Sequence, residues 1–247
     1  MSKTGPHTYV IGDIHGALLA LEQVIQKISL QKDDRLIFLG DYVDGWSQSQ
    51  QVIQYLIELD KNQNCIFIKG NHDAWCEEWL SGEEPDPTWL FHGGQATVDS
   101  YRPFTKRQKN VHLRFLQRMR PYYIDELNRL FIHAGFCSMR GPAHEHFESN
   151  CFWDRTLWET ALALDNRLEE DSIFYPKRLL LYPEIFIGHT PTTNYDVYEP
   201  MRAVNVWNID TGAAFTGKIS ALNVDTKEFW QSDTVQDLYP NEKGRNR

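Results

Sequence analysis

The 247-residue sequence lacks three features that would each indicate a particular class of protein. No apolar stretch approaches the roughly 20 residues of a membrane span, so we expect no transmembrane helix and no membrane partner. The four cysteines show neither CxxC spacing nor a disulfide framework, which favours a reducing, cytoplasmic location. No long run of Lys or Arg occurs and the net charge is -9, which argues against nucleic acid as the main partner.

The remaining composition is that of an ordinary globular protein, with 41% hydrophobic and 24% charged residues. The N-terminal residues lead directly into an expected strand, without the apolar region of a signal peptide. We expect a single domain over residues 1–232, with a helical or loop insertion around 82–120. The polar residues 233–247, which include Pro and Gly, are expected to form a frayed tail.

Apolar residues in the first third of the chain alternate between two patterns. His7–Ile11, Leu36–Leu39 and Cys65–Ile68 are predicted to be buried strands, because they are short runs rich in aliphatic residues. Apolar residues at helical spacing follow the first two runs, and Asn71 is placed to cap a helix over residues 72–80. Strand and helix in this order predict parallel βαβ units.

The rest of the chain mixes helices and strands, which predicts an α/β (α+β) fold class. Lys106–Arg120 is amphipathic and predicts a helix, whereas Asp125–Asn128 lies between two apolar runs as a hairpin turn does. Another helix is expected over residues 154–168. Strands are expected at residues 184–187, 203–209 and 218–224.

Five short strings place polar side chains directly after apolar runs. They are Gly12-Asp13-Ile14-His15-Gly16, Gly40-Asp41-Tyr42-Val43-Asp44, Gly70-Asn71-His72-Asp73, Phe131-Ile132-His133-Ala134-Gly135 and Gly188-His189-Thr190. Any specified four-residue string occurs by chance once in roughly 10⁵ positions at usual residue frequencies. A lone His after a strand is more often a satisfied polar residue than a ligand, but several strings together argue against coincidence.

These strings predict a metal centre at the carboxyl ends of the strands. Carboxylate, amide and imidazole groups are ligands that suit Mn²⁺, Fe or Zn²⁺. Two adjacent divalent cations, about 3.5–4 Å apart, activate a shared water for attack on a phosphate ester. The predicted metal ligands are Asp13, His15, Asp41, Asn71, His133 and His189.

The strings resemble those of the calcineurin-like metallophosphoesterases. Within that superfamily they are more narrowly similar to the phosphoprotein phosphatase branch, and within the branch to the bacterial members that resemble the bacteriophage lambda phosphatase. Gly40–Asp44 is the most specific string, because the wider superfamily usually lacks its second aspartate. The resemblance extends from Gly12 to about Gly212, and both Trp89–Tyr101 and Trp153–Arg155 are similar to the bacterial members. It implies a β-sandwich flanked by helices, with a two-metal site at one sheet edge.

The resemblance also implies roles for residues that do not bind metal. His72 is expected to be the general acid that protonates the leaving oxygen, and Asp44 to orient its ring and raise its pKa. Arg155 matches a phosphate-binding arginine of the bacterial members. Each has a structural alternative: a helix-start residue for His72, a turn residue for Asp44 and a solvent salt bridge for Arg155.

The sequence departs from the family pattern at Gly45, where the family usually has an arginine in Asp-Arg-Gly. Glycine has no guanidinium group to bind a phosphate, so the resemblance alone does not assign protein-phosphatase activity to this chain. Arg102 and Lys106 are candidates to replace the missing cation, and the sequence does not select between them. We expect three tryptophans to lie in the core rather than against substrate: Trp153, Trp158 and Trp207.

The expected function is that of a metal-dependent phosphomonoesterase, namely a serine/threonine protein phosphatase that uses a dimetal-bound hydroxide, with Mn²⁺ as the first metal to test. Its substrate would be a phosphorylated protein or a small phosphate ester.

The alternative is a symmetrical dinucleoside polyphosphate (diadenosine tetraphosphate) hydrolase, which needs aromatic platforms and cations for the phosphate chain. A binding protein that has lost catalysis remains a third reading. A nuclease is disfavoured by the acidic charge and by Asp44.

Overall fold

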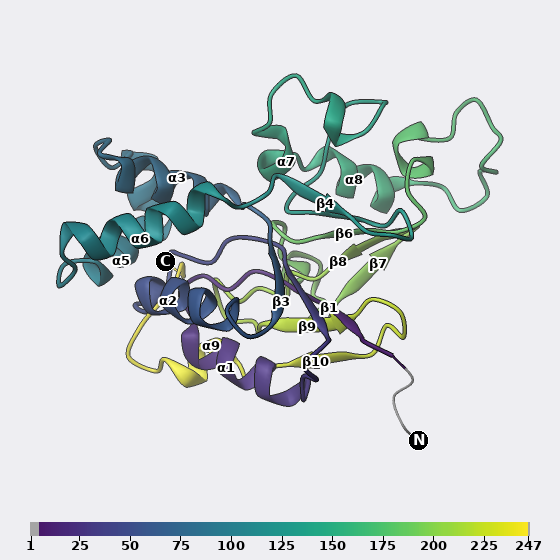
Figure 1. Ribbon diagram of the computed structural model, residues 1–247. Helices are drawn as coiled ribbons and strands as arrows, with labels where there is room; N and C mark the ends of the chain where they lie inside the picture. The colour runs from purple at the N-terminus through teal and green to yellow at the C-terminus, as the bar shows by residue number, and fades with distance from the viewer. Residues whose placement is uncertain (1–4, 247) are drawn as a thin grey trace.

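Two β-sheets form the centre of the computed structural model, which describes residues 5–246. The first sheet contains β1 (Thr8–Ile11), β2 (Arg35–Phe38), β3 (Asn64–Phe67), β9 (Ser220–Asn223) and β10 (Phe229–Gln231). The second contains β4 (Tyr122–Ile124), β5 (Leu130–Ile132), β6 (Ile185–Ile187), β7 (Met201–Ala203) and β8 (Val206–Asn208). Their strand orders are β10-β9-β1-β2-β3 and β4-β5-β6-β8-β7 (Figure 1). The expected sandwich is therefore confirmed.

Helices cover the outer faces of both sheets, as Figure 1 shows. The α-helices are α1 (Leu18–Lys27), α2 (Ser49–Leu59), α3 (Asn71–Ser81), α4 (Pro87–Trp89), α5 (Gln95–Ser100), α6 (Lys106–Gln117), α7 (Asn150–Trp153), α8 (Thr156–Ala163) and α9 (Val235–Leu238). Shorter turns are η1 (Leu90–Gly94), η2 (Pro142–His144), η3 (Lys177–Leu180) and η4 (Thr192–Tyr195). The helices α1 and α2 pack on the first sheet, whereas α8 packs on the second.

Strand alternation divides the apolar residues into three layers. In β1, Val10 lies in the layer between the sheets, while Tyr9 and Ile11 lie in the layer under α1 and α2. Successive side chains of a strand point to opposite faces, so one apolar run supplies two layers. Leu157 and Trp158 of α8 belong to the third layer, on the outer face of the second sheet.

The predicted parallel pairing is confirmed in the first sheet. β1 pairs with β2 in parallel, with Val10 opposite Ile37, and β2 pairs with β3, with Ile37 opposite Ile66. In the second sheet, β5, β6 and β8 are also parallel neighbours. The carboxyl ends of the parallel strands consequently deliver the following loops to one edge of the sandwich.

Some element boundaries differ from the prediction. Asn71 is the first residue of α3 rather than its cap; the backbone N–H of Gly70 is instead bonded to the Asp73 carboxylate. The helix expected over residues 154–168 is limited to α8. Asp154 accepts the N–H groups of Thr156 and Leu157 and so marks its start, and the backbone becomes extended at Leu164 and ends it. The short strands β7 and β10 were not predicted.

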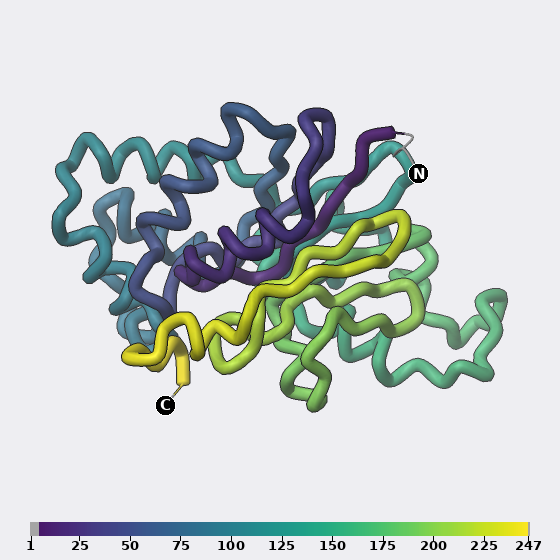
Figure 2. The backbone as a smooth tube through the Cα atoms, turned by 90° about the horizontal axis from the view of Figure 1, so that it is seen from below, coloured from purple at the N-terminus to yellow at the C-terminus, as the bar shows by residue number. Residues whose placement is uncertain are grey.

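The C-terminal segment is folded, and the expectation of a frayed tail is wrong for residues 233–246. Val235 is buried, and the ring of Tyr239 packs against Trp46 with centroids 5.3 Å apart. The Glu242 carboxylate accepts hydrogen bonds from the N–H (2.9 Å) and hydroxyl (2.7 Å) of Ser47. Figure 2 shows this segment in yellow beside α1. These apolar and charged contacts offset the polar composition of the segment.

Two expectations concern residues outside the described range. Residues 1–4 of the expected domain and residue 247 of the expected tail are not described. The single-domain assignment of residues 1–232, with its insertion around 82–120, stays a prediction.

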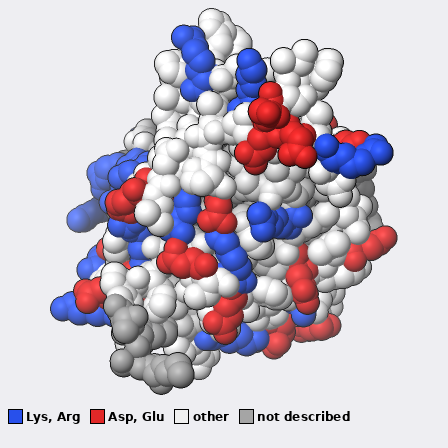
Figure 3. Space-filling view, turned by 90° about the vertical axis from the view of Figure 1, so that its right-hand side faces the viewer, with Lys and Arg blue, Asp and Glu red and all other residues white. Residues whose placement is uncertain are grey.

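Within residues 5–246, no helix combines the length and apolar character that crossing a bilayer requires. On the face drawn in Figure 3, acidic and basic side chains are interspersed, so that face carries no continuous basic surface.

Candidate active site

Strand ends supply the polar side chains of the site. Asp13 and His15 follow β1, Asp41 follows β2, and His189 follows β6. His15, Asp41 and His189 have φ angles of 53°, 53° and 67°, in the left-handed region that non-glycine residues rarely adopt. Such strained backbone persists where the surrounding structure determines it, and it is frequent at functional sites. The sharp turns direct these side chains to a common point instead of along the sheet.

Short distances connect the predicted metal ligands that follow β1, β2 and β6. The Nε2 atom of His15 lies 3.8 Å from Oδ2 of Asp13 and 3.6 Å from Oδ2 of Asp41. The backbone N–H of His189 lies 3.2 Å from Oδ2 of Asp13. All of these residues are buried. The strand ends therefore converge as the sequence predicts.

The remaining predicted ligands join the same cluster from the second sheet and α3. The Nε2 atom of His133 lies 3.4 Å from Oδ2 of Asp41 and 3.3 Å from Oδ1 of Asn71. All six predicted metal ligands thus belong to one connected set.

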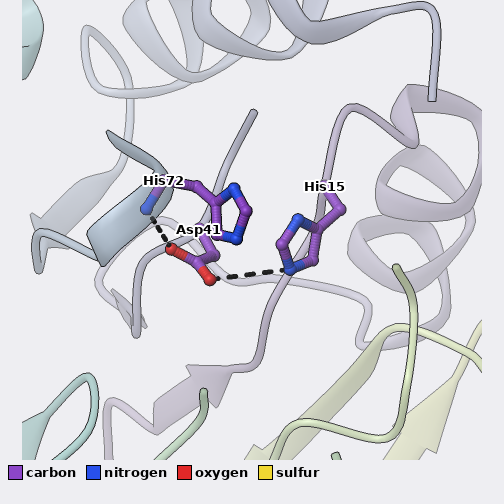
Figure 4. Close-up of side chains that lie close together, drawn as sticks. All are labelled: His15, Asp41 and His72. Carbon is purple, nitrogen blue, oxygen red and sulfur yellow. Dashed lines mark hydrogen bonds and ion pairs between the residues drawn. The ribbon is translucent and has the colours of Figure 1, made fainter. Parts of the chain in front are cut away.

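Within the described residues, two groups of side chains have the arrangement of a metal-binding site. One contains His15, Asp41 and His72, and the other contains Asp41, His133 and His189, each with ligand atoms within 4.8 Å of one another. Figure 4 shows the first group, in which the Asp41 carboxylate lies 3.0 Å from the His72 backbone N and 3.6 Å from Nε2 of His15. Asp41 belongs to both groups, because its Oδ2 atom lies near Nε2 of His15 and Nε2 of His133, so this one oxygen can face both cations.

Backbone carbonyls orient two of the imidazoles. The Nδ1 atom of His15 lies 3.2 Å from the carbonyl of Val43, and Nδ1 of His133 lies 2.7 Å from the carbonyl of Leu39. A carbonyl at Nδ1 selects the tautomer that leaves Nε2 as a lone-pair donor, which is the usual arrangement of metal-binding histidines. The Nε2 atom of His189 is buried without a hydrogen-bond partner in residues 5–246. This donor set fits a divalent cation.

Buried carboxylates give the site an excess of negative charge. Burial, together with the charge of Asp210, raises the pKa of Asp13 well above its ordinary value. Burial raises the pKa of Asp210 to about 6, and Asp41 adds to the shift. A bound cation removes this repulsion, because it favours the ionised form of each carboxylate.

Asp210 was missed as a site residue, because the sequence analysis gave no role to the residues between the strands expected at 203–209 and 218–224. It follows β8 in the same way that Asp13 follows β1. Its position after an apolar strand was the signal that could have identified it.

Asp73 joins two of the strand-end loops. Its carboxylate accepts N–H groups from Asp41 (2.7 Å), Tyr42 (2.9 Å) and Gly70 (2.8 Å). Burial, with a further contribution from Asp41, raises the pKa of Asp73 to about 7. We infer that Asp73 positions the ligand-bearing loops rather than binding a metal itself.

His72 and Asp44 form a buried pair beside the metal-binding groups. The Nδ1 atom of His72 lies 2.5 Å from Oδ2 of Asp44. Asp44 also accepts hydrogen bonds from the indole N–H of Trp89 and the hydroxyl of Thr97, both at 2.6 Å. The side chain of Asp44 is thus held in one orientation and aligns the His72 ring. Trp89 and Thr97 lie in the stretch Trp89–Tyr101 that resembles the bacterial members, but the sequence analysis gave neither residue a role at the site.

A cavity of about 240 Å³ opens over the metal-binding groups, and we call it the metal-side cavity. Asp41, His72 and His189 form part of its floor. Its rim is lined by the aromatic and cationic side chains Trp75, His92, Trp153, Arg155 and Arg245.

Trp153 corrects one expectation, because it is 43% exposed and lies at the cavity rim instead of in the core. It contacts Trp75 edge to face, with centroids 4.9 Å apart. Trp158 is buried as expected, and Trp207 packs against the layer between the sheets. Trp75 of α3, to which the sequence analysis gave no role, also lines the cavity.

The cationic residues of the cavity differ partly from the expected ones. Arg155 lines the cavity as expected, and its guanidinium donates a hydrogen bond of 2.9 Å to the hydroxyl of Thr190. Arg102 is exposed and pairs with Asp99, and neither Arg102 nor Lys106 lines this cavity. The second arginine is instead Arg245, from the C-terminal segment that was expected to fray.

Comparison with known proteins agrees with this geometry. The model of the calcineurin-like phosphoesterase family matches residues 6–213. The chain belongs to this family. Members of the family are hydrolases that act on phosphate esters, and the expected family and enzyme class are therefore confirmed.

Two curated relatives in the family have related names. The chain is 28% identical over 240 residues to the asymmetrical bis(5'-nucleosyl)-tetraphosphatase PrpE of Oceanobacillus iheyensis, covering 89% of each chain. It is 25% identical over 276 residues to the symmetrical bis(5'-nucleosyl)-tetraphosphatase of Neisseria meningitidis, covering 90% of this chain and 94% of the relative.

A solved structure supports the fold alone. A protein serine/threonine phosphatase from Saccharomyces cerevisiae superposes with a TM-score of 0.62 at 14% identity. The match covers 98% of this chain and 84% of the yeast protein.

Proposed function

We propose that this protein hydrolyses dinucleoside tetraphosphates with the help of two divalent cations. The proposed metal ligands are Asp13, His15, Asp41, Asn71, His133 and His189. Both curated relatives described above are named as bis(5'-nucleosyl)-tetraphosphatases, which supports the alternative rather than our main expectation of a phosphoprotein phosphatase.

The lining of the metal-side cavity is the observation that carries this proposal. Trp75 and Trp153 present indole rings at the rim, and Arg155 and Arg245 contribute positive charge. Aromatic rings provide stacking platforms for nucleobases, and guanidinium groups bind phosphate oxygens through paired hydrogen bonds. A phosphopeptide site needs the cations but not the platforms.

Each side chain has a role that its contacts support. When bound, the cations lower the pKa of a water molecule and neutralise charge on the phosphoryl oxygens. Asp41, shared by the two groups, sets the spacing of the ligand atoms. His72 donates a proton from Nε2 to the leaving phosphate oxygen, while Asp44 holds Nδ1 and orients the ring. Arg155, anchored on Thr190, binds a phosphoryl oxygen from the rim.

Parallel rate measurements test the proposed substrate class. The Mn²⁺-loaded protein is assayed with diadenosine tetraphosphate, a phosphoserine peptide and p-nitrophenyl phosphate, and the nucleotide products are separated by chromatography. We expect the dinucleotide to have the highest kcat/KM, by at least about tenfold, because it alone offers bases to the aromatic rim. Higher kcat/KM on the phosphopeptide would contradict the proposal. The products, two ADP or ATP with AMP, then show which bond is cleaved.

A further inference from the structure

Arg245 reaches the metal-side cavity from the far end of the chain. Its backbone N–H donates a hydrogen bond of 2.8 Å to the carbonyl of Ala214, and its guanidinium lies 5.3 Å from the centroid of the Phe215 ring. The contacts of Tyr239 and Glu242 with residues 46–47 hold the preceding segment against the loop that follows Asp44. The C-terminal segment therefore delivers one cation to the site from a fixed direction.

Two glycines provide the space that the Arg245 side chain occupies. A Cβ atom built on Gly45 would lie 3.2 Å from Cγ of Arg245, and one built on Gly93 would lie 3.1 Å from the same atom. Both glycines also have positive φ angles, 85° and 111°, which disfavour other residues. The aliphatic part of Arg245 is thus fitted between two loops, with Gly45 at the position where the sequence departs from the family pattern.

The cavity arginines differ from several others in their ionic partners. Arg35 pairs with Glu126 at 2.9 Å, and Arg118 pairs with Asp60 at 2.8 Å. In the part of the chain that the structure describes, no carboxylate forms an ion pair with Arg155 or Arg245. A guanidinium without a carboxylate partner keeps its N–H groups available for an anionic ligand, and phosphate matches its geometry.

A second cavity adjoins the first at Arg245. This outer cavity, of about 420 Å³, is lined by Phe91, His92, Phe215, Arg245 and Asn246. Arg245 and His92 line both cavities. Arg245 consequently lies between the metal-binding groups and a further partly aromatic space, where an extended substrate would leave the metal centre.

We propose that Arg245 binds the phosphate chain of the substrate where the chain passes from the metal-side cavity into the outer cavity. This inference rests on the proposed function, since only a substrate with several phosphates has a further phosphate to offer. A dinucleoside tetraphosphate has the required length and charge. Arg155 would then bind the phosphoryl group that lies nearer His189.

Steady-state kinetics of Arg245→Ala test the inference, with Lys243→Ala as the matched control. Lys243 lies two residues away in the same segment, is exposed and carries the same charge. We expect Arg245→Ala to raise the KM for diadenosine tetraphosphate about tenfold or more, with kcat within about twofold of the parent. The KM for p-nitrophenyl phosphate should rise far less, and Lys243→Ala should leave both within about twofold.

Arg245→Lys is a control for a folding defect in Arg245→Ala, because it keeps an aliphatic side chain between Gly45 and Gly93. It should raise the dinucleotide KM about threefold or more, since a single ammonium replaces the guanidinium fork. The inference is overturned if both variants keep the parent KM. It is also overturned if they lose dinucleotide and p-nitrophenyl phosphate hydrolysis equally, which would mean that Arg245 supports the metal centre or the fold.

A binding measurement separates this inference from the proposed function. Calorimetric titration of the Mn²⁺-loaded protein with methylenediphosphonate, a diphosphate analogue that cannot be hydrolysed, requires no turnover. We expect Arg245→Ala to weaken binding about tenfold and Lys243→Ala to leave it unchanged. If the parent fails to cleave the dinucleotide but this difference is found, the substrate assignment fails while phosphate binding by Arg245 stands. Equal affinities of Arg245→Ala and the parent would reject the role of Arg245.

Discussion

The floor and the rim of the metal-side cavity are built in different ways. The floor includes residues that directly follow strands, such as Asp41 and His189, and the order of the parallel strands brings them together. The rim draws Trp75 from α3 and Arg245 from the last residues of the chain. The difference indicates that the reaction chemistry depends on local strings, whereas the choice of substrate depends on how distant segments pack.

The largest expected effect comes from the floor, at the carboxylate shared by both metal-binding groups. Asp41→Asn removes the charge that faces two cations, so we expect kcat/KM to fall on the order of a thousandfold or more, together with loss of bound metal. Metal content after dialysis against Mn²⁺ and rates on p-nitrophenyl phosphate measure the two effects. Asp33→Asn, at an exposed position, is the matched control. Two ions retained at full activity would show that Asp41 is not the bridging ligand.

His72→Ala is expected to have the next largest effect and to divide the floor into two functions. We expect kcat to fall about a hundredfold, because general acid catalysis contributes at least this much, while bound metal stays near the parent level. The loss should be greater for an alkyl phosphate than for p-nitrophenyl phosphate, whose leaving group needs the proton less. Loss of one metal ion in this variant would instead make His72 a ligand with His15 and Asp41.

Trp153→Ala tests the rim with a smaller expected effect. Stacking of a base on an aromatic side chain contributes about 1–3 kcal/mol, so the KM for diadenosine tetraphosphate should rise roughly tenfold. The KM for p-nitrophenyl phosphate should change less than about twofold, since that substrate has no nucleobase. Phe229→Ala removes another partly exposed aromatic ring, on β10, and should leave both KM values unchanged. An equal rise for both substrates would remove the distinction between floor and rim.

Substitution of His112 is expected to have the smallest effect, and it provides a comparison with the histidines of the floor. It is hydrogen-bonded to Tyr101 (2.8 Å) and Gln54 (3.1 Å), and burial lowers its pKa to about 4. The unfolded chain, with an ordinary histidine pKa near 6.5, binds more protons between about pH 6.5 and 4, so folding stability falls as pH falls through this range.

His112→Gln should remove part of that loss, on the order of 1–2 kcal/mol between pH 6.5 and 4.5. Urea unfolding of the parent and the variant at both pH values, with and without Mn²⁺, measures the difference. Because both ring nitrogens of His112 contact side chains, the difference should not depend on the metal. A difference that appears only in the metal-loaded protein would contradict this account.

Residues adjacent to predictable strands could be identified from the sequence alone. Strand exits predicted Asp13, Asp41 and His133 correctly as neighbours, because strand order and side-chain alternation determine where the next residues lie. Periodicity could not predict that Trp153 lies at the cavity rim, because an aromatic residue beside an apolar run is compatible with either core or rim.

Contacts between distant segments account for most of the remaining errors. Arg245 is 200 positions from Gly45 in the chain, and its place depends on contacts such as those of Tyr239 with Trp46. Such packing has no local pattern, so the C-terminal segment appeared to be a polar tail. The tail prediction failed because composition describes a segment by itself and not the surface that it covers.

Anomalous diffraction from crystals grown with Mn²⁺ tests the central claim, that Asp41 is shared by two cations, most directly. We predict two peaks roughly 3.5–4 Å apart, one on each side of the Asp41 carboxylate. One peak should lie nearest His15 and the other nearest His133 and His189. Peaks elsewhere, or no peak at Asp41 in a protein that cleaves diadenosine tetraphosphate, would contradict the account.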